Sequence, residues 1–557
     1  MSGIVAIGLV CALVVFQGGY YAGAVCVIGV ISAVAFIVLA ALRKVKSTCP
    51  FATCFLLAIA MLYLISALVH GATLTMLQEA AAWFAVAGMS LWCSCGTLGD
   101  KRHTLDALGI AGVVFAVAGI AMFAGILPLE GSVNAGRLMF VFQYANSSGL
   151  FFAVMAVICL CSDDKRIRIA SLLPIVALLL TQSVGAIVVF AVALVAIGIR
   201  TVRQQAMKPA ILGAACAGVV IACIAAALLL PGRVMQASQT FIERIVQMSD
   251  ALSLFGGNVI LGIGPDQWQF AFPAIQTAQY QAADVHCGYL QMALDAGIVA
   301  VLLLVAMLVI GAWRVGKRGD FASCLCVVMV AVHTLFDFDV QFAAIVMLLA
   351  LLLAEPSSAS CEPGEKRAPR IAFVTPQGKA ATVMCWCVAL LALGASCGGI
   401  YLDMRAGAVQ NASARGDAAE TASLVNASPV LQQDPNMQAC LVSALFDSGD
   451  YRGVIEATDA FDSPLGVVDF QRVVSFVQLD ESSNAIACMQ GMLHARPYDA
   501  ELYEATRQLV VEGDLGDAFA DAFDAEARRA NELIGSGHAA WLANQKTVEL
   551  IGERVAS

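Results

Sequence analysis

The chain has 557 residues, of which 60% are hydrophobic and only 13% carry a charge. Soluble domains contain about 25% charged residues, so this composition excludes an ordinary soluble protein and indicates an all-α, polytopic membrane helical bundle. The net charge of -10 comes mainly from residues 401–557, and an acidic segment of this kind argues against nucleic-acid binding.

Long apolar runs follow one another from the N-terminus to about residue 400. Residues 21–42, 211–230 and 293–313 each supply the roughly 20 apolar residues that a helix needs to cross about 30 Å of hydrocarbon. Cutting the chain at the short polar connections predicts roughly 12 to 13 spans. Residues 1–20 lack the basic start and the cleavage site of a signal peptide, so we expect the first span to direct insertion.

Lysine and arginine are concentrated in alternate connections between these spans. By the positive-inside rule, the connections that carry them are cytoplasmic. The N-terminus is then expected inside, and the segments at 127–145, 231–286 and 336–341 are expected outside, together with everything after the last span. The basic clusters are at 43–46, 100–103, 163–168, 200–208, 314–318 and 365–370.

Composition divides the chain into four parts. Residues 355–380 are rich in Pro, Ser and charged residues, which is typical of a flexible linker. We therefore expect a membrane domain at 1–354, a cytoplasmic linker at 355–380, a last transmembrane helix at 381–402 and an extracytoplasmic tail at 403–557.

The tail has a repeating helical pattern. Residues 434–457 resemble one tetratricopeptide unit, and Pro464 and Pro497 follow at roughly 30-residue steps, near the repeat period of about 34 residues. The pattern predicts an array of helical hairpins, with another kind of helical bundle as the alternative. Either would present a surface for a protein partner or a glycan.

The first outward segment of interest places Arg137 just outside a span, with Gln143 and Asn146 where the chain re-enters the membrane. An arginine near the bilayer needs an anionic partner, because a charge at the bilayer centre costs about 2.5–3.5 kcal/mol or more. An anionic headgroup or substrate would serve. A snorkelling arginine with no further role is the alternative.

The long outward segment 231–286 contains Arg244, then aromatic residues that include Trp268 and Tyr280, and ends at His286. Aromatic rings offer interfacial contacts or faces on which sugars stack. A histidine can accept a proton from a hydroxyl near neutral pH, whereas an arginine cannot. A lone histidine here is otherwise a hydrogen-bonding residue at a helix end.

The third outward segment carries His333, Asp337 and Asp339 at the outer end of a span. Two nearby aspartates can bind a metal and a nucleotide sugar, but nucleotide sugars are cytoplasmic and this turn is expected outside. We therefore expect helix capping and loop ordering from the two aspartates. Most of the 19 cysteines lie in spans and no CxxC spacing joins the outer ones, so neither a zinc site nor a disulfide framework is indicated.

Taken together, these segments resemble the O-antigen ligase and polymerase superfamily of integral-membrane glycosyltransferases, particularly Gram-positive members with tetratricopeptide tails. Each match is weak alone, but five in order on one predicted face, over most of residues 17–354, make the resemblance specific. It implies a glycosyltransferase C-like membrane fold. The matching stretches are R…FQYAN at 137–146, LTQSVGA at 180–186, Arg244 followed by GIGPDQW at 262–268, the tyrosine-to-VH…YLQ block at 280–291 and H-x3-DFD at 333–339.

This resemblance implies transfer of a glycan from a polyprenyl (undecaprenyl) pyrophosphate carrier to an acceptor hydroxyl, on the outer face of a bacterial plasma membrane and without a metal or cofactor. Arg137 and Arg244 would stabilise the leaving diphosphate. His286 would deprotonate or orient the hydroxyl, a contribution typically worth about 10²–10⁴-fold. The substrate-binding candidates are Gln143, Asn146, Gln182, Trp268 and Tyr280.

Two positions depart from the family pattern. Cys287 stands where the family usually has asparagine, and Val184 stands where it often has arginine. Loss of that arginine removes a potential phosphate ligand. Gln182, or a basic residue elsewhere in the chain, would have to compensate for the lost phosphate ligand, unless the substrate has shifted or the activity is reduced.

Several functions are compatible with this pattern. A polymerase and a ligase share the donor and differ only in the acceptor, which could be a glycan, a lipid, a wall polymer or a protein. A transporter of lipid-linked oligosaccharides would place charges at the membrane midplane, whereas these spans are nearly uncharged. A catalytically decayed scaffold, with Val184 and Cys287 as marks of decay, is the remaining alternative.

Overall fold

The computed structural model describes residues 2–43, 49–94, 98–204, 231–355, 378–459 and 466–552. Within these ranges the regular elements are helices, apart from one short two-stranded sheet. The predicted span at 211–230, most of the predicted linker and Pro464 lie outside the described residues.

The membrane part is built from the elements α1 (Ser2–Val15), η1 (Gln17–Gly19), α2 (Ala22–Ala41), α3 (Phe51–Val69), α4 (Leu74–Met89), η2 (Ser90–Trp92), α5 (Leu98–Phe123), β1 (Val133–Asn134), β2 (Arg137–Leu138), α6 (Ala145–Leu160), α7 (Lys165–Ala170), α8 (Leu172–Thr181), α9 (Val184–Arg203), α11 (Pro231–Gly256), α12 (Trp268–Ile275), α13 (Gly288–Ala296), α14 (Ile298–Lys317), α15 (Phe321–His333), η3 (Asp339–Gln341), α16 (Ala343–Leu352) and α17 (Lys379–Ala414).

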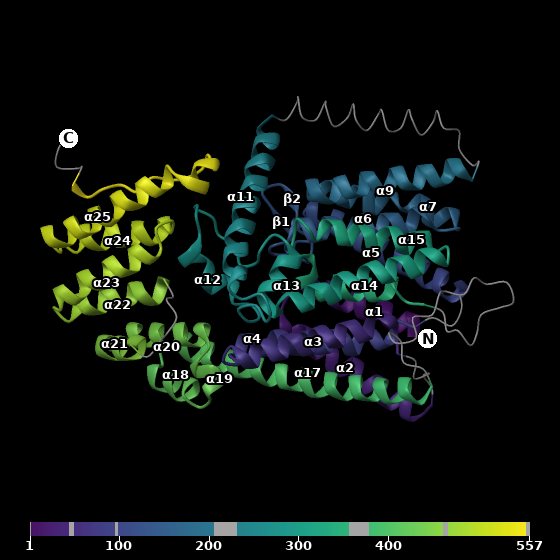
Figure 1. Ribbon diagram of the computed structural model, residues 1–557, viewed down its shortest axis with the longest axis horizontal. Helices are drawn as coiled ribbons and strands as arrows, with labels where there is room; N and C mark the ends of the chain where they lie inside the picture. Colours follow the sequence, from purple (N-terminus) through teal and green to yellow (C-terminus); the bar gives the residue numbers. More distant parts are fainter. Residues whose placement is uncertain are drawn as a thin grey trace.

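Six helices in the described part of the chain are long and apolar enough to cross a membrane, namely α2, α3, α5, α9, α14 and α17. The shorter apolar helices α1, α6, α15 and α16 pack against these helices, and Figure 1 shows α1, α6 and α15 in the same bundle. The chain is therefore an all-α, multi-pass membrane protein. The expected 12 to 13 spans stay a prediction, because length and composition do not decide whether the shorter helices cross.

The helix α17 packs along α2 and α4 through small residues. A Cβ added at Gly88 would lie 2.4 Å from the Cβ of Ala392, and one added at Gly399 would lie 2.5 Å from the Sγ of Cys26. Glycine at these places lets the helix backbones approach closely, as is common between membrane helices.

The helix α17 also extends beyond its predicted end at residue 402, because it continues without a break to Ala414. No proline interrupts this stretch, and the first glycine with a positive φ beyond the helix is Gly416 (φ 69°). At 1.5 Å per residue, its 36 residues reach about 54 Å, which exceeds the thickness of a bilayer. The same helix therefore belongs to both the membrane bundle and the tail.

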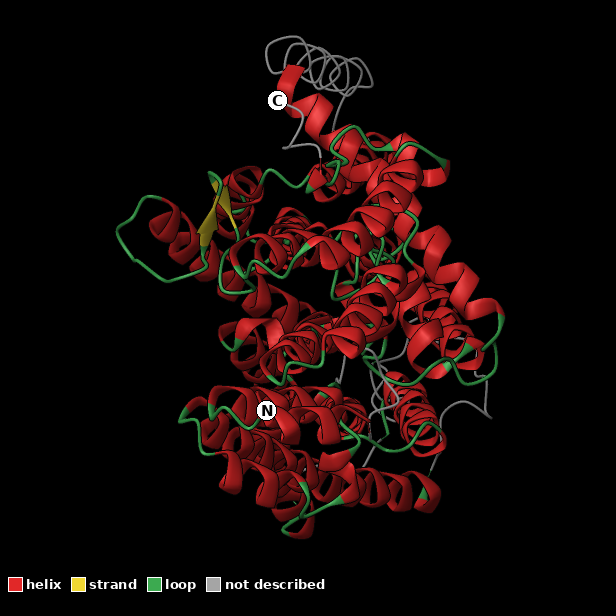
Figure 2. Ribbon diagram, turned by 90° about the vertical axis from the view of Figure 1, so that its left-hand side faces the viewer, coloured by secondary structure: helices red, strands yellow, loops and turns green. Residues whose placement is uncertain are grey.

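Residues 231–286, expected as a long connection, contain the helices α11 and α12. In Figure 1, α11 stands across the ends of the bundle helices, and α12, α13 and the β1–β2 hairpin lie at the same end. The tail lies at this end too, and Figure 2 views the molecule from that side. The segments that carry Arg137, Arg244 and His286 thus share one end of the bundle, as the sequence predicts.

The described part of the tail is a succession of short helices, and from α19 onward consecutive helices pack against one another. Asp434 caps α20 by accepting hydrogen bonds from the backbone of Asn436 and Met437, and Pro435 follows at the first helical position. The tetratricopeptide character of these helices stays a prediction. They are α18 (Ala418–Val425), α19 (Pro429–Gln432), α20 (Pro435–Asp447), α21 (Tyr451–Asp459), α22 (Gly466–Gln478), α23 (Ser482–Ala495), α24 (Ala500–Glu512), α25 (Asp517–Ile534) and η4 (Gly537–Trp541).

Candidate active site

Arg137 lies on a β-hairpin at the end of the bundle that is next to the tail. Strands β1 and β2 pair antiparallel, and Ala135 and Gly136 between them both have positive φ, as a two-residue hairpin turn requires. The guanidinium of Arg137 donates from Nε to the carbonyl of Thr181 at 3.0 Å and from Nη2 to Oδ1 of Asn146 at 3.2 Å. This arginine therefore connects the hairpin to the turn before α9 and to the start of α6.

Tyr144, just before α6, joins that group to the other two segments. Its hydroxyl donates to Oδ1 of Asp337 at 2.7 Å and accepts from Nδ2 of Asn146 at 2.9 Å. The same oxygen lies 3.3 Å from Nδ1 of His286. The ring stacks on Phe338 with centroids 4.7 Å apart, which fixes the direction of the hydroxyl.

Arg244 on α11 binds the other carboxylate oxygen of Asp337. Its Nη1 lies 3.2 Å from Oδ2 of Asp337 and also donates to the carbonyl of Phe336. The arginine side chain is 16% exposed and the aspartate side chain is 1% exposed. Within the described ranges, Nε of Arg244 has no hydrogen-bond partner, so this guanidinium keeps a donor that no protein group uses.

His286 lies between α11 and the Asp337 loop. Its backbone N–H donates to Oε1 of Gln247 at 2.9 Å, and Nε2 of Gln247 donates to the carbonyl of Asp284 at 3.1 Å. The side-chain amide of Gln247 thereby holds the backbone on both sides of Val285. The imidazole is 24% exposed, and its Nδ1 lies 3.6 Å from Oδ1 of Asp337, within ion-pair distance but too far for a hydrogen bond.

The hydrogen-bond network assigns a tautomer to His286. The Tyr144 hydroxyl has one proton and donates it to Asp337, so the imidazole can bond to that oxygen only as a donor from Nδ1. In the neutral imidazole, Nε2 then carries the lone pair. The nitrogen that can accept a proton is therefore the one that does not face Asp337.

Two aspartates near His286 have opposite electrostatic environments. Burial alone would raise the pKa of Asp337, but the contact with His286 and the charge of Arg244 hold it well below its usual range. Burial raises the pKa of Asp284, and the hydrogen bond from Tyr20, at 2.6 Å, only partly offsets this. The site thus contains an ionised carboxylate at Asp337 and, at Asp284, a carboxyl group whose pKa is raised.

The two aspartates of the DFD stretch have separate partners. Asp339 accepts a hydrogen bond from Ser147 at 2.9 Å and lies 2.6 Å from Nδ1 of His333, and both members of the latter pair are buried. Asp337 belongs to the Arg244 and His286 group instead. The expected capping role is not what the structure contains, because the residue preceding α16 is Phe342 and neither aspartate caps that helix.

Trp268 and Tyr280 are buried, although the sequence suggested sugar-stacking faces. Trp268 is 0% exposed and Tyr280 is 7% exposed, and Phe272 stacks between them with centroids 5.7 Å from each ring. The indole N–H donates to the carbonyl of Ala282, and the phenol donates to Asp250. Both rings therefore form the core of the α11–α12 segment and present no open face to a sugar.

The remaining substrate-binding candidates border the network. Gln182 has a left-handed backbone (φ 51°) and donates to the carbonyl of Gly136 at 2.8 Å, next to Arg137. Gln143 is exposed and contacts the carbonyl of Glu130. Val184 begins α9 with 60% of its side chain exposed. Because valine is uncharged, this position supplies no charge to the site.

Three members of the network were not singled out as functional from sequence. Tyr144 lies inside the FQYAN stretch and Asp337 inside the DFD stretch, so the pattern contained both without assigning a contact. Gln247 follows Arg244 by one helical turn, but no local signal marks it as a partner of His286. Its role depends on the return of the chain from α12, which only the three-dimensional structure provides.

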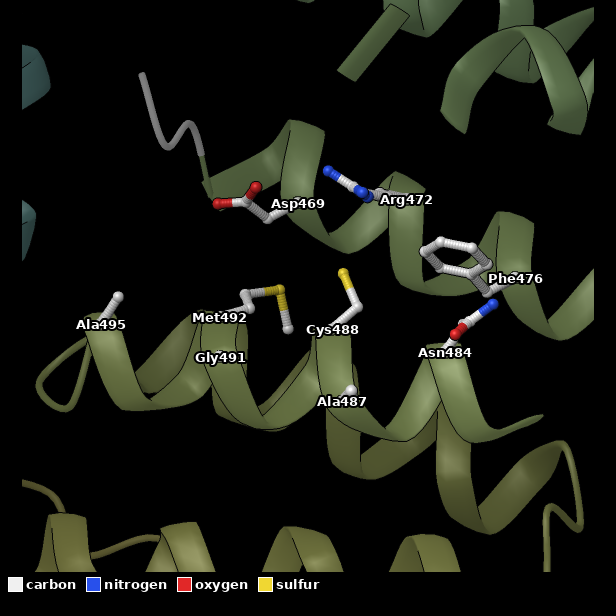
Figure 3. A pocket seen from close by; sticks show the side chains of 9 residues that line it. All are labelled: Asp469, Arg472, Phe476, Asn484, Ala487, Cys488, Gly491, Met492 and Ala495. Atoms are coloured by element: carbon white, nitrogen blue, oxygen red, sulfur yellow. The ribbon is translucent and has the colours of Figure 1, made fainter. Parts of the chain in front are cut away.

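A separate hollow of about 440 Å³ lies in the tail between α22 and α23 (Figure 3). Its lining includes Asp469, Arg472, Phe476 and Cys488. Arg472 is already paired with Asp459 and lies over the ring of Phe476. This hollow contains none of the residues of the network at the bundle end.

Comparison with known families gives a match in the middle of the chain. Residues 169–305 match the family model described as O-antigen ligase. The match includes Gln182, Arg244 and His286, whereas Arg137 and Asp337 lie outside it. No curated protein matches the chain.

Proposed function

Because residues 169–305 of this multi-pass membrane protein match the O-antigen ligase family model, we propose that the chain transfers a glycan from a polyprenyl pyrophosphate carrier to an acceptor hydroxyl. The observation that carries the proposal is the convergence of Arg244, His286 and Asp337 at the end of the bundle that also carries the tail. A base, a charged donor and an orienting carboxylate are the groups that such a transfer needs.

His286 is the proposed general base. Its Nε2 takes the proton of the acceptor hydroxyl, and the resulting oxygen forms a bond to the anomeric carbon of the donor sugar. Asp337, 3.6 Å from Nδ1, stabilises the imidazolium that forms, as the carboxylate does in other His-carboxylate arrangements. Because Asp337 stays ionised, this stabilisation is present across the neutral range.

Arg244 is the proposed ligand of the leaving group. As the bond between the anomeric carbon and the pyrophosphate oxygen breaks, negative charge accumulates on the diphosphate, and a guanidinium offers fixed donors to it. Arg244 has an Nε with no partner in the described part of the chain, which supports this role. Arg137 lies three hydrogen bonds from Asp337, through Asn146 and Tyr144, and is the proposed second contact to the donor.

The experiment replaces His286 with alanine in the native host and separates lipid-linked and surface glycans by size. We expect product formation to fall about 10²–10⁴-fold at an unchanged amount of protein in the membrane. Single repeat units left on the carrier would identify a polymerase, and full-length polymer left on the carrier would identify a ligase.

The matched control is His494→Ala, which removes a histidine of the tail that is 63% exposed and pairs with Glu526. This variant is expected to keep the wild-type glycan profile. If His286→Ala also keeps that profile, the proposal is wrong, and transport or a scaffold role becomes the better interpretation.

A further inference from the structure

The last part of the tail is docked on the segment that leads to His286. Gln279 and Gln545 exchange bonds, since the backbone N–H of Gln279 donates to Oε1 of Gln545 at 2.8 Å and Nε2 of Gln545 donates to the carbonyl of Gln279 at 3.3 Å. The side chain of Gln279 bonds both the N–H and the carbonyl of Lys546, at 2.5 and 2.7 Å. Residues 276–280 and 545–546 are thus joined by four hydrogen bonds.

Asp250 on α11 accepts hydrogen bonds from the same segment, residues 276–280. Its buried carboxylate accepts from the N–H and the hydroxyl of Thr277, at 3.0 and 2.7 Å, and from the hydroxyl of Tyr280 at 2.9 Å. The Oγ1 of Thr277 lies 2.8 Å from Nδ1 of His538 in the tail. Because the Thr277 proton goes to Asp250, His538 must be the donor in this contact.

Apolar packing accompanies these polar contacts. Within the described residues, Ile534, Ala539 and Leu542 of the tail belong to one buried cluster with Val246 of α11 and Val285, the residue before His286. The shared core and the carboxylate of Asp250 are buried, and a buried polar group is costly to leave unpaired, whereas the hydrogen bonds between Gln279 and Lys546 are exposed. The tail is therefore a structural neighbour of the proposed base.

The helix α11 connects the docked segment to the network. Arg244, Gln247 and Asp250 are spaced by three residues and so lie along one face of the helix. Each contacts a different part of the site: Arg244 binds Asp337, Gln247 holds the backbone of His286, and Asp250 holds the segment bound by the tail. About 9 Å of helix axis separates the first of these residues from the last.

We propose that residues 537–546 of the tail are a positioning element of the proposed active site, with His538 and Gln545 as positioning residues. These residues fix residues 276–280 against α11, and thereby fix the segment that leads from α12 to His286. They also keep Arg244 and Gln247 of α11 in contact with Asp337 and His286. The inference rests on the proposed function, because it concerns the turnover of that site. It assigns to the tail a part in catalysis that does not require the tail to bind substrate.

The experiment uses the full chain in membrane vesicles of the native host that lack the wild-type protein, supplied with that host's extracted lipid-linked glycan. Initial rates are measured over a range of glycan concentrations for the double variant His538→Ala/Gln545→Ala. We expect kcat to fall by about 10- to 100-fold, the cost of a misplaced catalytic group, with KM within about twofold. His538→Asn, whose Nδ2 can donate as Nδ1 of histidine does, is expected to restore most of the rate.

Two further variants keep the test decisive. Thr277→Val removes the partner of His538 from the loop side, together with the hydrogen bond from Thr277 to Asp250, and leaves the tail unaltered. It is expected to lower kcat in the same way as the double variant, and it gives this readout even if the double variant is poorly folded. The control His494→Ala changes a tail histidine that does not contact the loop and is expected to keep the wild-type rate. Western blots and limited proteolysis of the tail check the amount and the fold of each variant.

A rise in KM with unchanged kcat would overturn the positioning role, because it would mean that the tail binds substrate. Wild-type rates in both the double variant and Thr277→Val would overturn it too, provided that His286→Ala abolishes turnover. If His286→Ala is itself active, the proposed function fails, and the positioning role fails with it. The His286 variant therefore distinguishes the two failures.

Discussion

At the scale of single residues, Asp337 connects groups that lie far apart in the chain. Its carboxylate contacts Arg244, 93 positions away, and Tyr144, 193 positions away. A carboxylate with 1% of its side chain exposed remains ionised only because these partners and His286 offset the cost of burial. The residue is thus required for both the arrangement and the charge of the site.

Replacing Asp337 with asparagine is therefore expected to leave Arg244 as an uncompensated, mostly buried charge. Removing one partner of a buried ion pair costs about 3–5 kcal/mol, and we expect a value toward the lower end because the Arg244 side chain is 16% exposed. The measurement is the thermal unfolding midpoint of the purified protein in detergent, together with turnover.

A matched control for this change is Asp163→Asn. Asp163 pairs with Arg102 at the same N–O distance of 3.2 Å, but the two side chains are 83% and 76% exposed. Solvent screens such a pair, so the unfolding midpoint is expected to stay at the wild-type value. Equal midpoints for the Asp337 and Asp163 variants would contradict the importance assigned to the buried pair.

Asp284 gives a prediction that depends on pH. Because its pKa is raised in the folded protein, folding takes up a proton in the interval between the ordinary value, about 4, and the raised value. The free energy of unfolding then falls as the pH rises through that interval. Asp284→Asn cannot titrate and its Oδ1 can still accept from Tyr20, so we expect the variant to lose less stability than the wild type as the pH increases.

The measurement for Asp284 is the unfolding midpoint of both proteins from pH 4 upward. The difference between variant and wild type should grow with pH and then level off once the wild-type carboxyl is fully ionised. A difference that is constant over the whole range would mean that Asp284 does not titrate differently in the folded and unfolded states.

At the scale of elements, α17 depends on close helix contacts. Gly399 and Gly398 are neighbours on this helix, yet a Cβ at Gly399 would meet Cys26 and Ala81 at 2.5 and 3.1 Å, whereas a Cβ at Gly398 would meet nothing within 4 Å. Gly399→Leu is therefore expected to separate α17 from α2 and α4 and to lower the free energy of unfolding by about 1–3 kcal/mol, the usual cost of overpacking. The unfolding midpoint should fall accordingly. Gly398→Leu should be tolerated.

The comparison between the two glycine variants is best made on protein extracted in mild detergent, where the midpoint and the yield of monodisperse protein are both measurable. Because both substitutions add the same side chain to the same helix, they share any effect of helix propensity or hydrophobicity. Equal midpoints would show that the contact of α17 with α2 and α4 does not limit stability.

At the scale of the whole molecule, the sequence predicted which segments lie at the same end of the bundle, but it did not predict the side-chain contacts between them. Alternate basic loops and apolar runs predicted that Arg137, Arg244 and His286 share one end of the bundle, because that depends only on the number of helices between them. The contact between Tyr144 and Asp337 depends on how distant helices pack, which no local pattern contains. Trp268 and Tyr280 were misassigned because an aromatic ring serves equally well in a core and at a binding surface.

The helices α20–α25 are attached to the membrane part near both ends, through the continuous helix α17 and the hydrogen bonds of Thr75 to Asp434 at one end, and through the docked residues 537–546 at the other. A domain on a single flexible linker samples many orientations, and the effective concentration of its cargo at a target follows from linker length. With both ends attached, the surface of these helices keeps one orientation relative to His286. Anything bound there would therefore meet the site at an effective concentration determined by a fixed geometry.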